Sequence, residues 1–143
     1  MVEGCLFCRI VNGTEPAYVV WNSPETVAFL DTRPVFKGHA LLVTRPHVGT
    51  LADLSAELMT PLLAATQRLA SAMQTALGAQ GAFVAMNNVV SQSVPHLHVH
   101  VVPRTKGDGL RGFFWPRTRY ADDTEADEYA SRLRSALAEP TQV

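Results

Sequence analysis

The feature that most constrains the fold is the alternating run His96-Leu97-His98-Val99-His100-Val101-Val102. Histidine and aliphatic residues alternate with a period of two, which is the period of a β-strand and not of a helix. On a strand, the three imidazoles share one face and the aliphatic side chains share the other. The run therefore predicts a strand with one face against the core and a row of imidazoles on the opposite face.

Three imidazoles on one strand face suggest a chemical function. Neighbouring histidines on one strand face lie ~7 Å apart, so we expect the rings to form a row without touching. A lone histidine on a strand is usually an ordinary core or surface residue, but this run holds three of the five histidines in the chain. Metal ligation, phosphate binding and nucleophilic catalysis are the candidate uses, and a division of labour is easier than one metal held by all three.

The rest of the pattern completes an α+β plan, a five-stranded antiparallel sheet with one long helix packed on it and a short C-terminal helix. The helical stripe over 55–77 has Ser55 as a plausible N-cap and Gly78 as its stop. Pro61 either kinks this helix or begins a second helix capped by Thr60. Strands are predicted at 18–21, 27–30, 39–44, 82–87 and 96–102, the last ended by Pro103, and the short helix at 124–137 with Thr124 as its N-cap.

Length and composition fit one domain over 1–143, with a motif-bearing core at 5–104 and a tail at 105–143. The net charge of −1 gives no overall attraction to nucleic acid or an anionic membrane, so we expect neither as a partner. No apolar run approaches the ~18 residues of a membrane span, and no signal peptide is visible, so we expect a cytoplasmic protein.

Two further segments carry chemistry-bearing residues. Cys5 and Cys8 are the only cysteines, and their spacing favours half a metal site over a redox pair, because no βαβ pattern surrounds them. The stretch 104–120 mixes basic and aromatic residues and either closes over a site, contacting a polyphosphate or the leaving group, or packs as an edge loop with solvated arginines. Its members are Arg104, Lys106, Arg111, Phe113, Phe114, Trp115, Arg117, Arg119 and Tyr120.

The histidine run resembles the signature of the histidine triad family of nucleotide hydrolases and transferases. Other blocks resemble the same family in the same order, so the likeness covers about residues 5 to 104. These blocks are Cys5-Leu6-Phe7-Cys8-Arg9-Ile10, the segments 28–34 and 38–43, Pro46-His47, Asn87-Asn88 and Gln92-Ser93-Val94. The loop 87–92 departs from the family pattern, because it looks about two residues shorter and lacks glycines before Gln92-Ser93.

The resemblance implies a role for each matching residue. His98 would be the nucleophile that attacks the α-phosphorus, with its other ring N–H bonded to the backbone carbonyl of His96. His100 would donate to the phosphate oxygens, His39 would reach the same oxygens or the surroundings of the nucleophile, and Asp31 would accept the ribose hydroxyls. Ser93, Asn87 and Gln92 would contact the phosphate and leaving group, the last two less surely because of the altered loop. The apolar base slot would be formed by Phe7, Ile10, Phe29 and Leu41.

The resemblance also implies a structural zinc ion held by Cys5, Cys8, His47 and His96, which is the tetrahedral Cys₂His₂ set that zinc prefers. Members of the family are usually homodimers, so we expect a homodimer here. The closest branch is that of the purine nucleoside phosphoramidases, which act on nucleoside phosphoramidates or aminoacyl adenylates. A dinucleoside polyphosphate hydrolase is the alternative enzyme, and a nucleotide-binding regulatory protein is the alternative without catalysis.

Overall fold

The computed structural model describes residues 2–111 and 117–138, which fall into two compact units, residues 1–108 and residues 109–143. The first unit holds the sheet and its two flanking helices, and the second holds α3 (Asp123–Ala138). That the two make up one domain stays a prediction.

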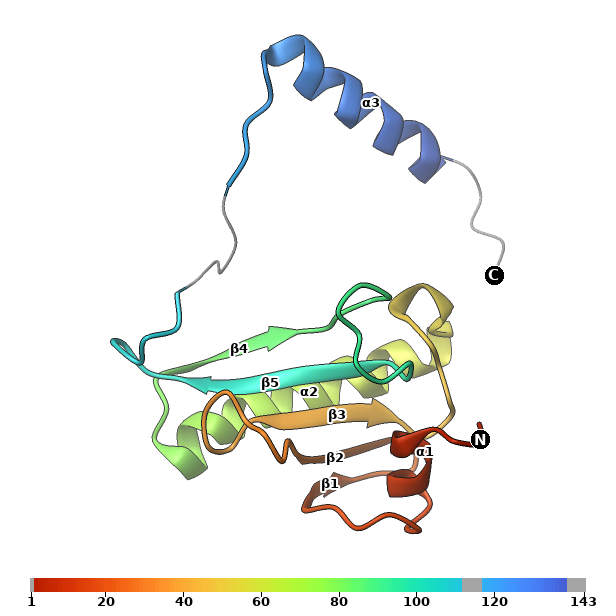
Figure 1. The fold of residues 1–143 in the computed structure, drawn as a ribbon, viewed down its shortest axis with the longest axis vertical. Coiled ribbons are helices and arrows are strands. Elements are labelled where there is room, and N and C mark those ends of the chain that lie inside the picture. The colour runs from red at the N-terminus through yellow and green to blue at the C-terminus, as the bar shows by residue number, and fades with distance from the viewer. Residues whose placement is uncertain (1, 112–116, 139–143) are drawn as a thin grey trace. The chain divides into compact units, whose positions relative to one another are not determined.

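The first unit is built on a five-stranded antiparallel sheet, which confirms the predicted fold class. Its strand order is β1-β2-β3-β5-β4, so β5 lies in the interior between β3 and β4 (Figure 1). The strands are β1 (Val19–Asn22), β2 (Thr26–Leu30), β3 (Ala40–Thr44), β4 (Gly81–Ala85) and β5 (His98–Arg104).

Strand β5 begins and ends two residues later than predicted. It begins late because His96 and Leu97 make other bonds, the backbone N–H of Leu97 donating to the carbonyl of Val48 at 2.6 Å. It continues through Pro103 because the pairing with β3 ends at Val101. Beyond that point β5 pairs only with β4, through Pro103 and Arg104. A proline can lie in a strand where its missing N–H faces no partner.

Helix α2 (Ala56–Leu77) covers one face of the sheet and is continuous through Pro61, so neither a second helix nor a cap at Thr60 is present (Figure 1). Ser55 occupies the N-cap position without a side-chain cap bond, and Gly78 ends the helix in the left-handed conformation at φ 68°. Between α2 and the sheet lies an apolar core formed by Ala28, Ala40, Leu42, Val48, Leu54, Leu62, Ala65, Leu69, Met73, Leu97, Val99 and Val101.

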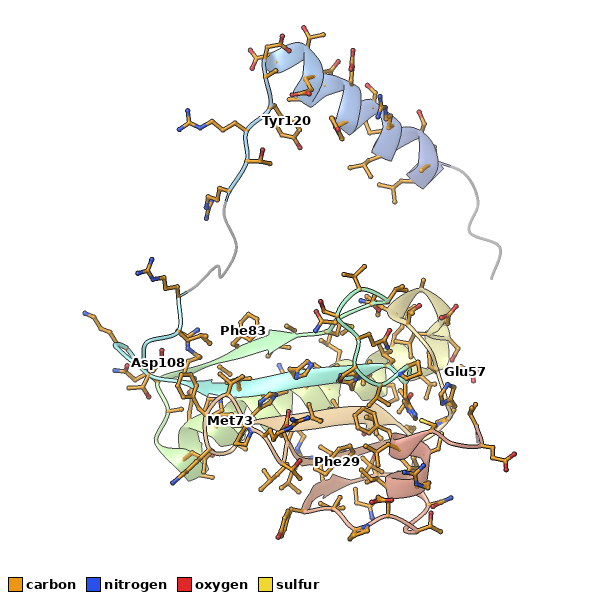
Figure 2. The ribbon with its side chains drawn as sticks, viewed as in Figure 1. Phe29, Glu57, Met73, Phe83, Asp108 and Tyr120 are labelled. Atoms are coloured by element: carbon orange, nitrogen blue, oxygen red, sulfur yellow. The ribbon has the colours of Figure 1, made fainter. Side chains whose placement is uncertain are left out.

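The predicted aliphatic face of the histidine run is therefore correct, because Leu97, Val99 and Val101 all belong to this core. The helical stripe is shorter than predicted, since Leu77 at its end is exposed while Met73 one turn earlier is buried. Figure 2 shows Met73 on α2, and Phe29 on β2.

A second, smaller core lies against α1 (Leu6–Val11), a helix that the sequence pattern did not predict. The thiol of Cys5 caps this helix by accepting from the backbone N–H of Cys8 at 3.5 Å. Phe7 packs edge-on against Phe29 of β2, with ring centroids 5.3 Å apart. This contact ties the N-terminal helix to the same sheet face that carries the histidines.

In the second unit, α3 begins at Asp123 rather than after a cap at Thr124. The backbone N–H of Glu125 donates to the carboxylate of Asp122 at 2.8 Å, so Asp122 supplies the cap. Within the described residues, no helix is long and apolar enough to cross a membrane.

Candidate active site and metal cluster

The imidazoles of His98 and His100 lie on the sheet face opposite α2, beside α1. They are opposite Val43 and Leu41 of β3, and the ring of Phe7 lies 5.1 Å from that of His98. The rings of His98 and His100 are 4.9 Å apart and in contact, so the expectation that they do not touch is wrong. Backbone spacing alone did not allow for imidazoles that tilt toward one another.

The hydrogen bond of His98 fixes which of its nitrogens can react. Its Nδ1 lies 2.8 Å from the backbone carbonyl oxygen of His96, as expected. A carbonyl only accepts, so Nδ1 carries the proton and Nε2 keeps its lone pair. Because His98 is 2% exposed, little water competes for that lone pair.

A second chain of hydrogen bonds orients His100. The backbone N–H of Val35 donates to Nδ1 of His39 at 3.2 Å, so the proton of His39 is on Nε2. This Nε2–H lies 2.9 Å from Nδ1 of His100 and donates to it, which leaves the proton of His100 on its own Nε2. The carboxylate of Asp31 lies 3.7 Å from Nδ1 of His39, which is farther away than the backbone N–H of Val35 that donates to the same nitrogen. His100 therefore presents an N–H where His98 presents a lone pair.

Burial favours the neutral forms of His39 and His100. Burial above all, and to a lesser extent the neighbouring His98 and His39, lower the pKa of His100 to about 4, against an opposing effect of Asp31. Burial also lowers the pKa of His39, again opposed by Asp31. The neutral imidazole of His39 donates to that of His100, which in turn keeps an N–H for another acceptor.

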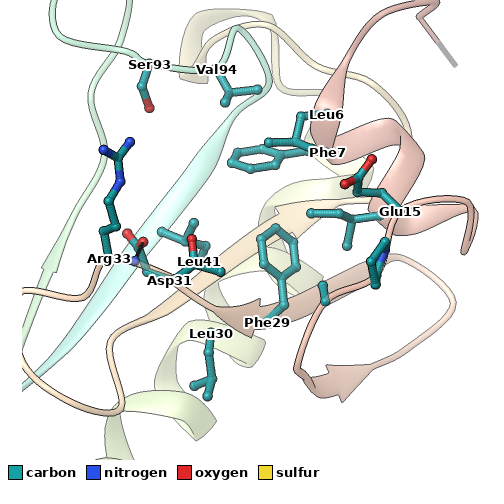
Figure 3. A pocket seen from close by; sticks show the side chains of 14 residues that line it. Leu6, Phe7, Glu15, Phe29, Leu30, Asp31, Arg33, Leu41, Ser93 and Val94 are labelled. Atoms are coloured by element: carbon teal, nitrogen blue, oxygen red, sulfur yellow. Dashed lines mark hydrogen bonds between the residues drawn. The ribbon is translucent and has the colours of Figure 1, made fainter.

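A cavity of about 610 Å³ is lined in part by Phe7, whose ring contacts that of His98, and by Leu41, which pairs with His100, but His39, His98 and His100 do not line it (Figure 3). It brings together six of the residues expected to bind substrate or phosphate, namely Phe7, Ile10, Phe29, Asp31, Leu41 and Ser93. Figure 3 shows Asp31, Arg33 and Ser93 on one side, with Phe7 and Phe29 between them and Glu15. The cavity thus has a polar end and an apolar middle.

Asn87 and Gln92 are not among the residues that line this cavity. The amide of Gln92 instead holds its own loop, because it accepts from the backbone of Val89 at 2.9 Å and donates to the carbonyl of Gly49 at 2.7 Å. Asn88 accepts from the backbone N–H of Leu51 at 2.7 Å, and Asn87 is exposed. The structure therefore gives Gln92 a bracing role and leaves Asn87 outside the cavity.

The shortened loop adopts backbone angles that favour glycine. Val89 has φ 69° and Ser91 has φ 61°, and for a β-branched residue this region is sterically unfavourable. These residues stand where the family resemblance led us to expect glycines. The bonds of Gln92 within the loop hold this conformation.

Cys5, Cys8, His47 and His96 converge on one point, with their ligand atoms all within 4.8 Å of one another. Nδ1 of His96 lies 3.5 Å from Sγ of Cys5 and 3.7 Å from Sγ of Cys8, and Nδ1 of His47 lies 3.3 Å from Sγ of Cys8. Ligands at zinc bond lengths in a tetrahedron stand about 3.6 Å apart from sulfur to nitrogen. The donor set and its spacing are therefore compatible with zinc.

His96 is prepared for this role by its second nitrogen. Its Nε2 lies 2.8 Å from the backbone carbonyl of Thr44, so the lone pair is on Nδ1, toward the two sulfurs. Burial lowers the pKa of His96, and the bond to Thr44 opposes that effect. Burial raises the pKa of the Cys5 thiol, so a cation at this point is what would stabilise a thiolate.

The basic and aromatic stretch is divided between the two units. Arg104 forms an ion pair with Asp108 at 2.6 Å within the first unit, which favours the packed alternative for this residue. Phe113, Phe114 and Trp115 lie outside the described residues. Tyr120 packs against Tyr129 of α3, with ring centroids 5.7 Å apart.

The cavity also contains two charged residues that sequence reasoning did not select, Glu15 and Arg33. Arg33 stands two residues after Asp31, and its backbone N–H donates to that carboxylate at 2.8 Å. Its closeness to Asp31 in the chain could have indicated it. Glu15 lies in the segment before β1, where turn-forming residues precede the strand, and nothing in that segment indicated that its side chain would line the cavity.

Comparisons with known proteins identify relatives of this chain in both sequence and fold. A model of the HIT domain matches residues 12–107. The adenosine 5′-monophosphoramidase of Saccharomyces cerevisiae is 30% identical, over 94% of this chain and 81% of that protein. A crystal structure from Streptococcus mutans UA159 aligns with a TM-score of 0.86 at 31% identity, over 96% of this chain and 87% of that one. A Zn-bound histidine triad protein from Mycobacterium smegmatis aligns with a TM-score of 0.72 at 32% identity, over 95% and 98%.

Proposed function

Because the chain belongs to the HIT domain family, we propose that it is a hydrolase that cleaves purine nucleotide conjugates at the α-phosphorus, with His98 as nucleophile. The substrates of this proposal are nucleoside phosphoramidates and aminoacyl adenylates. The relative named as an adenosine 5′-monophosphoramidase supports this class of reaction.

The observation that carries the proposal is the bond between Nδ1 of His98 and the carbonyl of His96 at 2.8 Å. It holds the ring with the lone pair of Nε2 available for attack. Attack forms a bond from Nε2 to phosphorus and breaks the bond from phosphorus to the leaving group. The nitrogen of a phosphoramidate leaves as an amine after taking a proton from water, whereas the carboxylate of an aminoacyl adenylate leaves without one. Water then attacks the phosphorus and gives a proton to solvent, the bond to Nε2 breaks, and the nucleotide and His98, still protonated on Nδ1, are released.

His39 and His100 support this reaction as a donor pair. The relay from Val35 through His39 leaves Nε2–H of His100 as a donor to the oxygens of the α-phosphate. In this proposal His39 acts by positioning His100, and Ser93 adds a donor from the polar end of the cavity. Donors fixed in a partly dry site stabilise the charge that develops on the phosphate oxygens.

The remaining cavity residues would hold the nucleoside. Asp31 would accept both ribose hydroxyls, while the purine would lie among Phe7, Ile10, Phe29 and Leu41. Asn87 and Gln92 were expected to contact the phosphate or leaving group. In this proposal Gln92 holds the loop and Asn87 has no assigned contact.

We also propose that Cys5, Cys8, His47 and His96 hold a structural zinc ion. Four protein ligands fill a tetrahedral site, so the ion would offer no open position to substrate and would supply folding energy instead. It would fasten α1 to the residues that lead into β5. His96 would then serve twice, with its ring at the zinc and its carbonyl at His98.

A substrate test decides the nucleophile. The wild-type protein should hydrolyse adenosine 5′-phosphoramidate and, when quenched in base, carry a nucleotidyl group on the peptide that contains His98. His98→Gly should lose at least about a thousandfold in kcat/KM, and added imidazole should restore part of the turnover. His100→Asn is the matched control, since it should turn over slowly yet still form the adduct. Full turnover by His98→Gly without imidazole would refute the assignment.

A dinucleoside polyphosphate hydrolase is the second candidate, favoured by Arg33. Its guanidinium lines the cavity and is directed toward Ser93 (Figure 3), where a phosphate chain leaving from the α-phosphorus would emerge. Arg33→Gln should lower kcat/KM for diadenosine tetraphosphate and leave that for adenosine 5′-phosphoramidate nearly unchanged. Equal effects on both substrates would remove the support for this candidate.

The other expectations stay predictions. These are the homodimer, the cytoplasmic location, the absence of nucleic-acid and membrane partners, and the role of the stretch 104–120. A regulatory nucleotide-binding protein is the alternative without catalysis. It would be favoured if His98→Ala left the cellular role intact while abolishing turnover.

A further inference from the structure

We propose that Glu15 reads the purine base and makes this protein prefer guanine over adenine nucleotides. The inference rests on the proposed function and adds to it the identity of the base. It comes from the position of one carboxylate in the cavity, from its hydrogen-bonding capacity, and from the two edges that purines can present to it.

Glu15 lies at the far side of the cavity from the expected phosphate and ribose contacts. It lines the wall together with Pro16 and Ala17, whereas Asp31 and Arg33 lie on the other side, with Phe7 and Phe29 between (Figure 3). A nucleotide with its ribose at Asp31 and its phosphorus at His98 has to direct its base along this apolar middle. The edge of the base farthest from the ribose then meets Glu15.

The carboxylate of Glu15 is held in place but keeps acceptor capacity. Oε2 accepts from Nε of Arg9 at 3.2 Å, and the backbone N–H of Glu15 donates to the carbonyl of Arg9 at 3.1 Å. No other partner of this carboxylate is found among residues 2–111 and 117–138. An ionised carboxylate has about four acceptor positions and no donor, so one bond from Arg9 leaves it able to accept more.

The two purines differ at the edge that this carboxylate would meet. Guanine presents two adjacent donors, N1–H and the exocyclic amino group at C2, which match a carboxylate in bidentate fashion. Adenine presents one amino group beside the bare lone pair of N1, which would face another acceptor. A site with a fixed acceptor penalises the base that lacks the matching donor.

The size of the preference follows from this pairing and from the exposure of Glu15. A bidentate side-chain contact to a base discriminates by roughly 5- to 150-fold. The side chain of Glu15 is 38% exposed, so water can partly satisfy it when adenine is bound. We therefore expect about a tenfold preference for guanine.

An exchange of Glu15 for glutamine separates base reading from a merely structural ion pair with Arg9. The amide presents one acceptor and one donor, which matches the amino group and N1 of adenine. Glu15→Gln should therefore bring the guanine-to-adenine ratio to about 1 or below. A structural role would lower turnover of both substrates together and leave their ratio unchanged.

The experiment compares kcat/KM for guanosine and adenosine 5′-phosphoramidate in the wild-type protein, Glu15→Gln and Glu57→Gln. Glu57 is an exposed residue in the first turn of α2 and does not line the cavity, so this matched control should keep the wild-type ratio. A ratio near 10 that falls only in Glu15→Gln supports the proposal. A wild-type ratio near 1, or a ratio that Glu15→Gln leaves unchanged, overturns it.

Calorimetric binding of GMP and AMP to the same three proteins distinguishes this inference from the proposed function. If neither phosphoramidate is hydrolysed but GMP binds about tenfold more tightly, with the difference lost in Glu15→Gln, the base preference stands and the proposed reaction fails. If both are hydrolysed at equal kcat/KM, the reaction stands and the base preference fails. If neither nucleotide binds, both are overturned.

Discussion

The neutral His100 makes the stability of this protein depend on pH in a way that one substitution can expose. Its pKa is about 4 in the folded protein, against 6.5 in the unfolded chain, chiefly because of burial. The folded state thus binds a proton less readily than the unfolded state does. The contribution to stability is complete above pH 6.5 and is lost as the pH falls toward 4.

The magnitude follows from the two pKa values. Between pH 7.5 and pH 5, the linkage relation gives a loss of about 2 kcal/mol in the free energy of unfolding. His100 is only partly buried, so solvent screening reduces this to about 1 kcal/mol. His100→Asn removes the titrating group but keeps an acceptor near the position of Nδ1, where His39 donates.

Urea unfolding of both proteins at the two pH values measures the effect. The wild-type midpoint should fall by about 0.5 M more than that of His100→Asn between pH 7.5 and pH 5, for an m-value of about 2 kcal/mol/M. Both proteins keep the Cys5, Cys8, His47 and His96 cluster, so its own acid sensitivity cancels in the comparison. Equal shifts in the two proteins would show that His100 is not held neutral by the fold.

Three further predictions concern the metal cluster, the strained loop and the core. Elemental analysis should find about one zinc ion per chain in the wild type and well below one in Cys8→Ser. A purified wild-type protein that contains no zinc would refute the site. Val89→Gly should raise the free energy of unfolding by up to about 1 kcal/mol, because its φ of 69° strains a side chain that is 75% exposed, whereas destabilisation would show that the valine packs usefully. Leu42→Ala, at a fully buried position in β3, should cost about 3 kcal/mol in chemical unfolding, and a cost below about 1 kcal/mol would contradict the packing between sheet and α2.

The local patterns were enough to predict the sheet and the long helix and to indicate Cys5 and Cys8 as half a metal site, whereas His47 and His96 were added by the family resemblance. The period-two alternation of 96–102 fixed the two faces of β5, since neighbouring side chains on a strand must point to opposite sides. The apolar stripe of 55–77 predicted α2, because side chains that recur about every 3.6 residues share one face of a helix. Cys5 and Cys8 indicated a metal because their spacing and the lack of a surrounding βαβ pattern left few alternatives.

Tertiary contacts decided where β5 begins and which ring nitrogens of the histidines carry protons. The onset of β5 at His98 depends on the bond from Leu97 to Val48, and the tautomer of His98 depends on the carbonyl that this onset leaves available at His96. Gln92 donates to the carbonyl of Gly49, 43 positions away, and no local pattern encodes that contact.

In the histidine run, the sequence determined some properties of the imidazoles and the folded structure determined others. The order of residues determined that the imidazoles share one face, because strand geometry is a property of the backbone. Which nitrogen of each ring carries the proton was decided by groups that only folding brings near, namely the carbonyls of Thr44 and His96 and the N–H of Val35. A ring nitrogen becomes a ligand, a nucleophile or a donor through the partner of the other nitrogen, and that partner lies on another segment or at a distance that only the folded backbone sets.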